Sequence, residues 1–296
     1  MRIAAYLQDE LTNSTDEQYD AIKNAGWNTL ILGLIHVEAP NPYNNPPIYG
    51  GTLYFNGGKA FEYGEYTGTP DFTDRVNGLI KGGTIRTLLA SVGGGSPPDY
   101  DFTNIQRLYE TRQDPQRGAG WSSLQSNFRA LRETFPSIAM IDMDNEELYD
   151  LPSFVAFCQM IIGIGYDITF SPFSDQSEFW NPALAQLEES NPSSVKWWNL
   201  QCYGPTEPDP AAWGDGIQSD PSLANFDTDG FIVAGEFGPT ENSPSDIQVL
   251  MEALADVPCV GGGFIWSADH IIQNEATWGS MEQYATAIAN GLDGNS

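Results

Sequence analysis

The sequence contains the segment Ser137-Ile-Ala-Met-Ile-Asp142-Met-Asp144-Asn-Glu146-Glu147, which is its most informative stretch. A short apolar run ends in three carboxylates, Asp142, Asp144 and Glu146, each two residues from the next. Residues two apart on a β-strand point to the same face, so these acids share one face. If that face is a barrel interior, desolvation and mutual repulsion raise at least one pKa, as a general acid at neutral pH requires. An acidic face toward solvent is the alternative.

Short apolar or β-branched runs recur along the whole chain and alternate with helical patterns. Such alternation predicts a parallel sheet, and eight repeats predict its closure into a (β/α)8 TIM barrel. We expect one catalytic domain over residues 1–296. The eight expected strands begin near Ile3, Thr29, Ile85, Ile138, Ile168, Lys196, Phe231 and Gly262.

Helix start signals lie between these strands. Thr15-Asp-Glu-Gln18 predicts a capping box with Gly26 ending the helix, and Ser243-Pro-Ser-Asp246 precedes the apolar pattern of residues 247–254. The other expected helices lie near residues 72–80, 124–135, 153–162, 182–189 and 281–290.

Two connections are longer than a barrel needs, the loops after strands 2 and 3. Residues 36–70 are rich in turn residues, predict a β-hairpin near 51–58 and hold seven aromatic residues from Tyr43 to Tyr66. Residues 93–120 form the other. Both follow a strand and so belong to the end of the barrel that carries active sites, unless their aromatic residues only pack within their own loop.

The composition excludes several classes of protein. The chain has 296 residues, 41% of them hydrophobic, and no apolar run that reaches a membrane span of roughly 18 residues. Its formal charge of -28, from 12 Lys+Arg and 40 Asp+Glu, repels phosphate backbones. We therefore expect no nucleic acid and no membrane as partner, and a monomer.

The chain has few residues for metal or thiol chemistry, with three Cys and two His. Cys158, Cys202 and Cys259 are odd in number and far apart, which indicates free thiols, and only His36 and His270 could serve a triad or a metal centre. A calcium loop counted from Asp142 places an acid where glycine is required and a serine where the last glutamate belongs. No metal and no cofactor are expected, and the chemistry should use carboxylates.

Four motifs in chain order resemble glycoside hydrolase family 18, the chitinase and endo-β-N-acetylglucosaminidase family, whose fold is a (β/α)8 barrel. The family pattern SxGG appears as Ser91-Val-Gly93-Gly94, and DxxDxDxE as the segment from Ala139 to Glu146. The tyrosine motif is matched by Gln201-Cys-Tyr203-Gly204, and the tryptophan that ends the last strand by Gly263-Phe-Ile-Trp266.

The resemblance implies a substrate-assisted, retaining hydrolysis of β-1,4-linked N-acetylglucosamine, as chitin or chito-oligosaccharides. Glu146 would protonate the leaving oxygen and later activate water. Asp144 would hold the acetamido N–H, and Asp142 would share a proton or hydrogen bond with Asp144. Tyr203 would donate to the acetamido carbonyl, and Trp266 would form the floor under the sugar.

Four further assignments are weaker. Tyr6, at the end of the first strand, is a candidate wall of the substrate site. Asn199 and Gln201 alternate with Tyr203 and should face the same lumen, where an amide can bind a sugar hydroxyl. Ser91 and the two glycines after it should serve close backbone packing. Glu236 has no role in the family, so placement at the rim or surface is expected.

Two departures keep alternatives open. Ala139 replaces the first aspartate of the strand-four motif, expected deepest in the barrel, and Gly204 stands where Asp or Asn often follows the tyrosine. A lectin-like or inhibitory protein that binds chitin without turnover is therefore an alternative, although Glu146 is retained. An endo-β-N-acetylglucosaminidase acting on N-glycan cores is another.

The sequence does not decide whether the protein is secreted or cytoplasmic. The first residues, Met1-Arg-Ile-Ala-Ala-Tyr6, lack the apolar core and cleavage site of a secretion signal. The protein is secreted if a signal preceded this chain and cytoplasmic otherwise.

We predict that salt stabilises the fold, because screening relieves the repulsion among so many acids. The melting temperature should rise as NaCl goes from about 0.01 to 1 M, over which the Debye length falls from roughly 30 to 3 Å. Thermal melts at three concentrations measure it, with KCl as a control for ion-specific binding. A steady fall would mean that the acids lie in attractive pairs.

Overall fold

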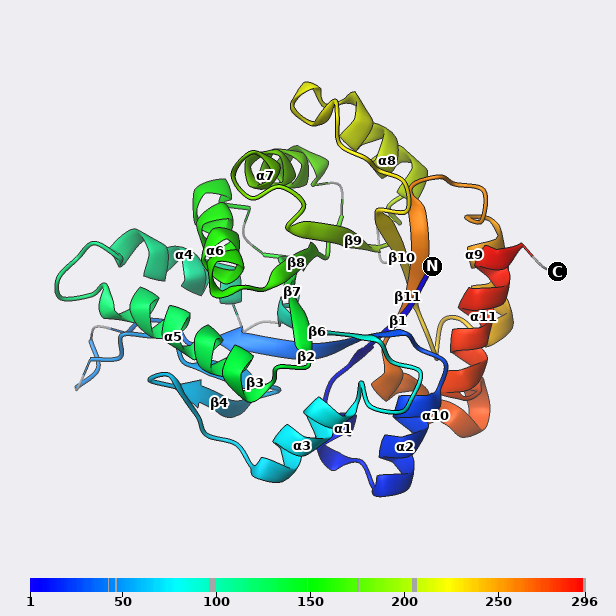
Figure 1. Ribbon diagram of the computed structural model, residues 1–296, viewed down its shortest axis with the longest axis horizontal. Helices are drawn as coiled ribbons and strands as arrows, with labels where there is room; N and C mark the ends of the chain where they lie inside the picture. The colour runs from blue at the N-terminus through cyan, green and yellow to red at the C-terminus, as the bar shows by residue number, and fades with distance from the viewer. Residues whose placement is uncertain are drawn as a thin grey trace.

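Eight parallel strands close into a barrel at the centre of the computed structural model (Figure 1). The structure describes residues 1–41, 43–45, 47–95, 100–147, 149–174, 176–203 and 207–294. Pairing of the first barrel strand with both the second and the last closes the sheet. The predicted barrel is confirmed.

All eight predicted strand starts lie within two residues of those in the structure. Each barrel strand pairs in parallel with its neighbours. The barrel strands are β1 (Arg2–Leu7), β2 (Thr29–Val37), β6 (Thr87–Gly93), β7 (Ile138–Asp144), β8 (Asp167–Phe170), β9 (Val195–Gln201), β10 (Ile232–Phe237) and β11 (Val260–Trp266).

Helices surround the barrel and bury their apolar sides against it (Figure 1). They are α1 (Glu10–Asn13), α2 (Asp16–Asn24), α3 (Pro70–Gly78), α4 (Asp101–Thr111), α5 (Ala119–Thr134), α6 (Leu151–Ile164), α7 (Ser177–Ser190), α8 (Pro210–Ser219), α9 (Pro244–Glu252), α10 (Ala268–Trp278) and α11 (Met281–Asp293), with a 3-10 turn η1 (Pro221–Leu223).

Local capping explains why the predicted helices begin where they do. Thr15 accepts a hydrogen bond from Gln18 N, and the Gln18 side chain accepts one from Thr15 N, which completes the predicted capping box of α2. Ser243 forms the corresponding box of α9 with Asp246. Both helix starts are confirmed.

Helices α1, α4, α8 and α10 were not predicted. The start of α4 shows why, because its cap residue Tyr100 makes no side-chain capping bond. The carboxylate of Glu147, from the loop after β7, instead accepts from Phe102 N at 2.7 Å and from the Thr103 hydroxyl at 3.0 Å. A cap supplied from 45 residues away leaves no local sequence signal.

The long connection after β2 forms the predicted hairpin, here β3 (Leu53–Phe55) and β4 (Gly58–Glu62), followed by β5 (Glu65–Tyr66). Its rings pack beside the barrel and not in its mouth. Phe61 and Tyr66 lie 6.0 and 5.3 Å from Phe135, between ring centroids. Because Phe135 follows α5, these two rings do not pack only within their own loop, and they are not among the residues that line the pocket at the mouth of the barrel.

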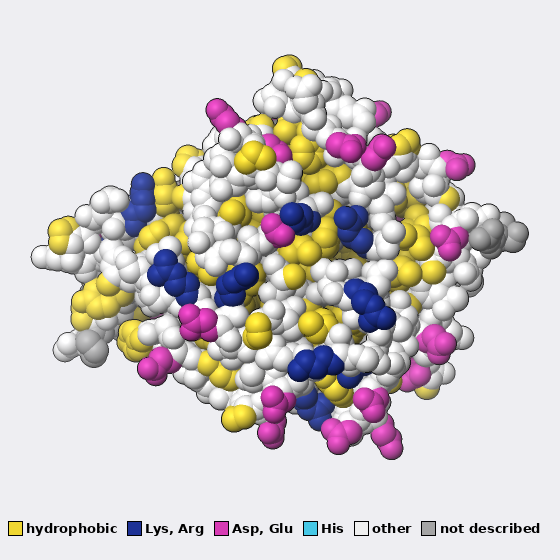
Figure 2. Space-filling model, in the orientation of Figure 1, with side chains coloured by type: hydrophobic (Ala, Val, Ile, Leu, Met, Phe, Trp, Pro, Cys, Tyr) yellow, Lys and Arg dark blue, Asp and Glu magenta, His cyan; other side chains and the backbone are white. Residues whose placement is uncertain are grey.

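Charge is unevenly distributed over the surface. On the face drawn in Figure 2, Lys and Arg side chains gather toward the middle and Asp and Glu lie mostly around the rim. Lys23, Arg75 and Arg132 occupy the last turns of α2, α3 and α5, where cations complement the helix dipole.

Two further expectations concern the thiols and the membrane. All three cysteines are free; Cys158 and Cys259 are buried and Cys202 is partly buried. Within the described ranges, none of the helices has the length and apolar character needed to cross a bilayer.

Candidate active site

The three acids of the segment 137–147 point into the barrel from the C-terminal end of β7. Asp142 is fully buried, Asp144 is 3% exposed, and Glu146 is half-buried two residues beyond the strand. Their alternation therefore places them on the interior face and not on the solvent face.

Asp142 lies at the centre of a buried hydrogen-bond network. Its Oδ2 accepts from the hydroxyls of Tyr6 at 2.9 Å and Ser91 at 2.8 Å. Its Oδ1 accepts from the Thr169 hydroxyl at 2.6 Å and from Asn199 Nδ2 at 2.9 Å. Burial raises the pKa of Asp142 above its usual value, and these four donors limit that rise. Four donors on two oxygens satisfy an ionised carboxylate, which can only accept.

Asp144 and Glu146 form a coupled pair above Asp142. Gln201 Nε2 joins them, at 3.0 Å from Asp144 Oδ1 and 3.1 Å from Glu146 Oε1. Burial, followed by the negative charges of Glu146 and Asp142, raises the pKa of Asp144 well above its usual range. Burial also raises the pKa of Glu146. Both shifts favour a proton shared by Asp144 and Glu146, which titrate together as one pair.

A pocket of about 390 Å³ opens over this pair. The Tyr203 ring packs against Phe237 at 4.6 Å, and Trp266 lies 5.2 Å from Tyr6, between ring centroids. Burial and the nearby acids raise the pKa of Tyr203 well above 10, so its hydroxyl remains a donor. The lining consists of Tyr6, Gln8, Leu34, Gly94, Gly95, Asp144, Glu146, Ser171, Phe173, Gln201, Tyr203, Phe237 and Trp266.

Glycines let the loop after β6 approach the acids closely. Gly93 and Gly94 have φ of +112° and +106°, and Gly94 N donates to the Asp144 carbonyl at 2.8 Å. A Cβ on Gly95 would collide with the Glu146 carboxylate. The packing role expected for the glycines agrees with this geometry, but Ser91 differs, because its hydroxyl binds Asp142.

The structure brings most predicted site residues together and separates Asn199 from the pocket. Tyr203, Trp266, Gln201 and Tyr6 line it, although Tyr6 is only 1% exposed and binds Asp142. Asn199 is fully buried and is not among the lining residues. Sequence reasoning missed Leu34 within β2 and four lining residues whose only signal is their place at or just beyond a strand end: Gln8, Ser171, Phe173 and Phe237.

The expectation for Ala139 is wrong. It lies near the start of β7, is exposed, and falls at a register shift between the pairs Leu88–Ile138 and Leu89–Met140. It is therefore not deep in the barrel, and the missing aspartate does not affect Asp142. The other departure, Gly204, lies outside the described residues.

The expectation of a rim position for Glu236 is also wrong, because it is 9% exposed near the end of β10. Its strand neighbours Gly235 and Phe237 face the lumen, so Glu236 points away from it. Burial, then the charges of Glu207 and Glu241, raises its pKa to about 8.

Within the described ranges no group of three or more His, Cys, Asp or Glu could hold a metal ion.

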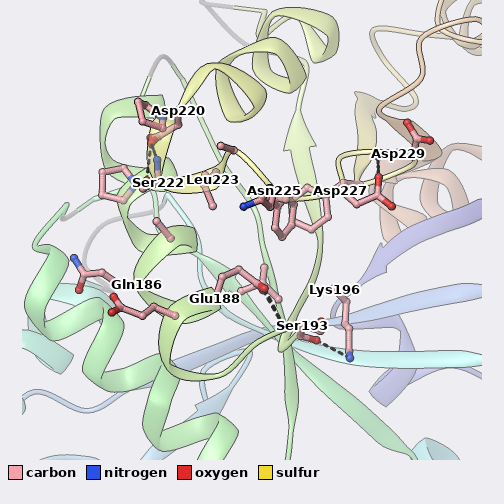
Figure 3. A pocket seen from close by; sticks show the side chains of 18 of the residues that line it. Gln186, Glu188, Ser193, Lys196, Asp220, Ser222, Leu223, Asn225, Asp227 and Asp229 are labelled. Atoms are coloured by element: carbon pink, nitrogen blue, oxygen red, sulfur yellow. Dashed lines mark hydrogen bonds between the residues drawn. The ribbon is translucent and has the colours of Figure 1, made fainter.

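A larger groove of about 1170 Å³ lies between α7 and the segment 220–231 (Figure 3). Its cations already have partners: Arg2 donates to Gly230 O, and Lys196 donates to Ser193 O and pairs with Asp167. It contains none of the three acids of β7. The smaller pocket, with its coupled acids, is therefore the candidate active site.

Comparison with known proteins adds support for the fold. No model of a protein family matches the sequence, and no curated protein matches it. The catalytic domain of a family GH18 chitinase from the fern Peteris ryukyuensis is 17% identical, with a TM-score of 0.56 over 98% of both chains. The GH18 chitinase ChiB from the chitin utilization locus of Flavobacterium johnsoniae is 11% identical, with a TM-score of 0.59 over 98% of this chain and 94% of that one.

A Group IV chitinase of Ostrinia furnacalis is 11% identical, with a TM-score of 0.58 over 98% of this chain and 99% of that one. At these identities the likeness shows that the chain has the barrel fold of these chitinases.

We predict that Glu236→Gln stabilises the protein increasingly between pH 4.5 and 8. The unfolded glutamate loses its proton near pH 4.5, whereas the folded one keeps it to about pH 8, so wild-type stability falls as pH rises through this window. The gain at pH 7 should be about 3 kcal/mol. Thermal unfolding at pH 5 and 8 measures it, with exposed Glu189→Gln as control. An equal gain at both pH values would contradict the assignment.

Proposed function

We propose that residues 1–296 form a single catalytic domain that hydrolyses β-1,4-linked N-acetylglucosamine, as chitin or chito-oligosaccharides, and acts as a monomer. The barrel fold of GH18 chitinases supports a glycosidase-like protein that binds a sugar substrate. The cluster in which Gln201 bridges Asp144 and Glu146 above the buried Asp142 is the observation that carries the proposal.

Glu146 is the proposed general acid. Its burial raises its pKa, and it lines the pocket where a glycosidic oxygen would lie. The proton of the coupled pair passes through Glu146 to the leaving oxygen as the C1–O bond breaks. The same carboxylate then takes a proton from the water that attacks C1.

The nucleophile is proposed to come from the substrate. Asp144 lies between Asp142, Glu146 and Gln201, so its position suits binding the acetamido N–H more than attacking C1. The acetamido oxygen would form the bond to C1, giving an oxazolinium ion that water opens with net retention. Asp144 would offset its positive charge.

The remaining residues orient the sugar. The Tyr203 hydroxyl, which stays protonated, would donate to the acetamido carbonyl, and Trp266 would lie under the sugar ring. Gln201 would fix both carboxyl groups. In this proposal Tyr6 and Asn199 act through Asp142, to which both donate.

The structure bears differently on the two alternatives, a lectin without turnover and an endo-β-N-acetylglucosaminidase. The exposed position of Ala139 removes one reason for proposing a lectin without turnover. An endo-β-N-acetylglucosaminidase would use the same chemistry on an N-glycan core, and no described residue favours that substrate over chitin.

We predict that Glu146→Gln abolishes turnover while the fold and ligand binding persist, because the amide keeps the shape but delivers no proton. The rate should fall by roughly 10² to 10⁴. Release of reducing sugar from a chitin oligomer, with calorimetric binding in parallel, measures both. Glu189→Gln on the surface of α7 is the matched control. Near wild-type activity in the purified variant would rule out this role for Glu146.

We also predict that the N-acetyl group is required chemically. Oligomers deacetylated at the sugar next to the scissile bond should turn over hardly at all, and an N-acetylglucosamine thiazoline should inhibit. Asp144→Ala should impair both turnover and thiazoline binding, since it removes the group that orients the acetamido. Efficient hydrolysis of a glucan or xylan, or a glycosyl ester trapped on Asp144, would move the protein to the two-carboxylate class.

A further inference from the structure

A line of buried hydrogen bonds runs from Asp142 toward the N-terminal end of the barrel. Asn199 Nδ2 donates to Asp142 Oδ1 at 2.9 Å, and Trp197 Nε1 donates to Asn199 Oδ1 at 2.8 Å. Asn199 is fully buried and Trp197 is 4% exposed. Both lie on β9 two residues apart, so they share the lumenal face.

The indole determines which way the amide of Asn199 faces. An indole N–H can only donate, so the amide must turn its oxygen toward Trp197. Its NH₂ group then faces Asp142, an ionised carboxylate that can only accept. Without the indole N–H, the end of the amide that faces Trp197 has no directional partner there.

Arg2 holds the indole from below. Its guanidinium carbon lies 4.4 Å from the Trp197 ring centroid, and its Nη1 donates to Gly230 O at 2.9 Å. A guanidinium stacked on an indole is a favourable contact. The ring is therefore fixed between Arg2 and Asn199.

We propose that Trp197 is a positioning residue, which orients the Asn199 amide so that it donates to Asp142. This inference rests on the proposed hydrolysis for its kinetic test. A reversed amide would remove one of four donors from Asp142 and place a carbonyl oxygen against a carboxylate.

Loss of the Asn199 donor should affect Asp144 and Glu146 through the charge of Asp142. The titratable groups around Asp142 are Tyr6 on β1, Asp144 on β7 and Tyr203 just beyond β9, with Glu146 beyond Asp144. Strands β6 and β8 contribute hydroxyls that do not titrate, from Ser91 and Thr169. Loss of a donor disfavours the ionised form of Asp142, so the acid limb of the pH–rate profile should move to higher pH.

The chain offers a matched pair of tryptophans for the experiment. Trp197→Phe keeps a ring but removes the N–H bound to Asn199. Trp198→Phe makes the same change at a buried indole whose N–H has no hydrogen-bond partner among the described residues. We expect kcat/KM on a chitin oligomer to fall about tenfold for Trp197→Phe, with the acid limb shifted upward, and neither change for Trp198→Phe. Equal effects of both variants would overturn the proposal.

Two further experiments change Asn199, and the first of them does not require that Trp197→Phe folds. Asn199→Leu keeps a similar side-chain shape, removes the donor to Asp142 and adds no charge, and should also shift the acid limb upward. Wild-type kinetics in that variant would overturn the proposal. In an Asn199→Ala background, Trp197→Phe should add no further loss, whereas additive losses would mean that the indole only packs.

Inactivity of the wild type on every N-acetylglucosamine oligomer would count against the proposed function and not against this inference. The Asn199 side-chain amide then provides the readout, followed by ¹⁵N NMR as pH is lowered. Its titration midpoint, which reports protonation of Asp142, should be higher in Trp197→Phe than in wild type. An unchanged midpoint would overturn the positioning role.

Discussion

The negative charge of Asp142 in the middle of the barrel is the constraint on which its interior depends. A carboxylate that is fully removed from water is costly unless its lone pairs are satisfied. Four strands each send one donor to it: Tyr6 from β1, Ser91 from β6, Thr169 from β8 and Asn199 from β9. The closed barrel makes this possible, because an open sheet would not bring strands from opposite sides of the order to one carboxylate.

The same charge sets the protonation of the acids above it. Asp142 contributes to the raised pKa of Asp144, after burial and Glu146, and Gln201 keeps Asp144 and Glu146 within reach of one amide. Two carboxyl groups so placed cannot both ionise easily near a third negative charge. A fixed anion at the bottom thus favours a protonated pair at the top, which is the arrangement that acid catalysis needs.

Periodic features could be predicted from the sequence, and contacts across the barrel could not. Strand starts, the capping box at Thr15 and the inward face of Asp142, Asp144 and Glu146 follow from local pattern. The cap on α4 comes from Glu147, far away in sequence, and the sites of Asn199 and Ala139 depend on strand register. The alternation of side chains predicts that Asn199 faces the lumen, but it does not predict how deep Asn199 lies. Asn199 was therefore expected to bind a sugar hydroxyl, whereas it is buried below the pocket.

Depth in the barrel also separates side chains that carry out chemistry from those that hold them. The lumenal residues of this part of the chain are Trp197, Asn199 and Gln201 on β9 and then Tyr203 beyond the strand. The three on the strand are buried, and Tyr203 is partly exposed. Water is excluded from the bottom of the barrel, so the polar atoms of Trp197 and Asn199 must form their hydrogen bonds with protein groups. A change at the bottom therefore alters the hydrogen bonds of the residue above it, and its effect on the acids passes upward through Asn199 and Asp142.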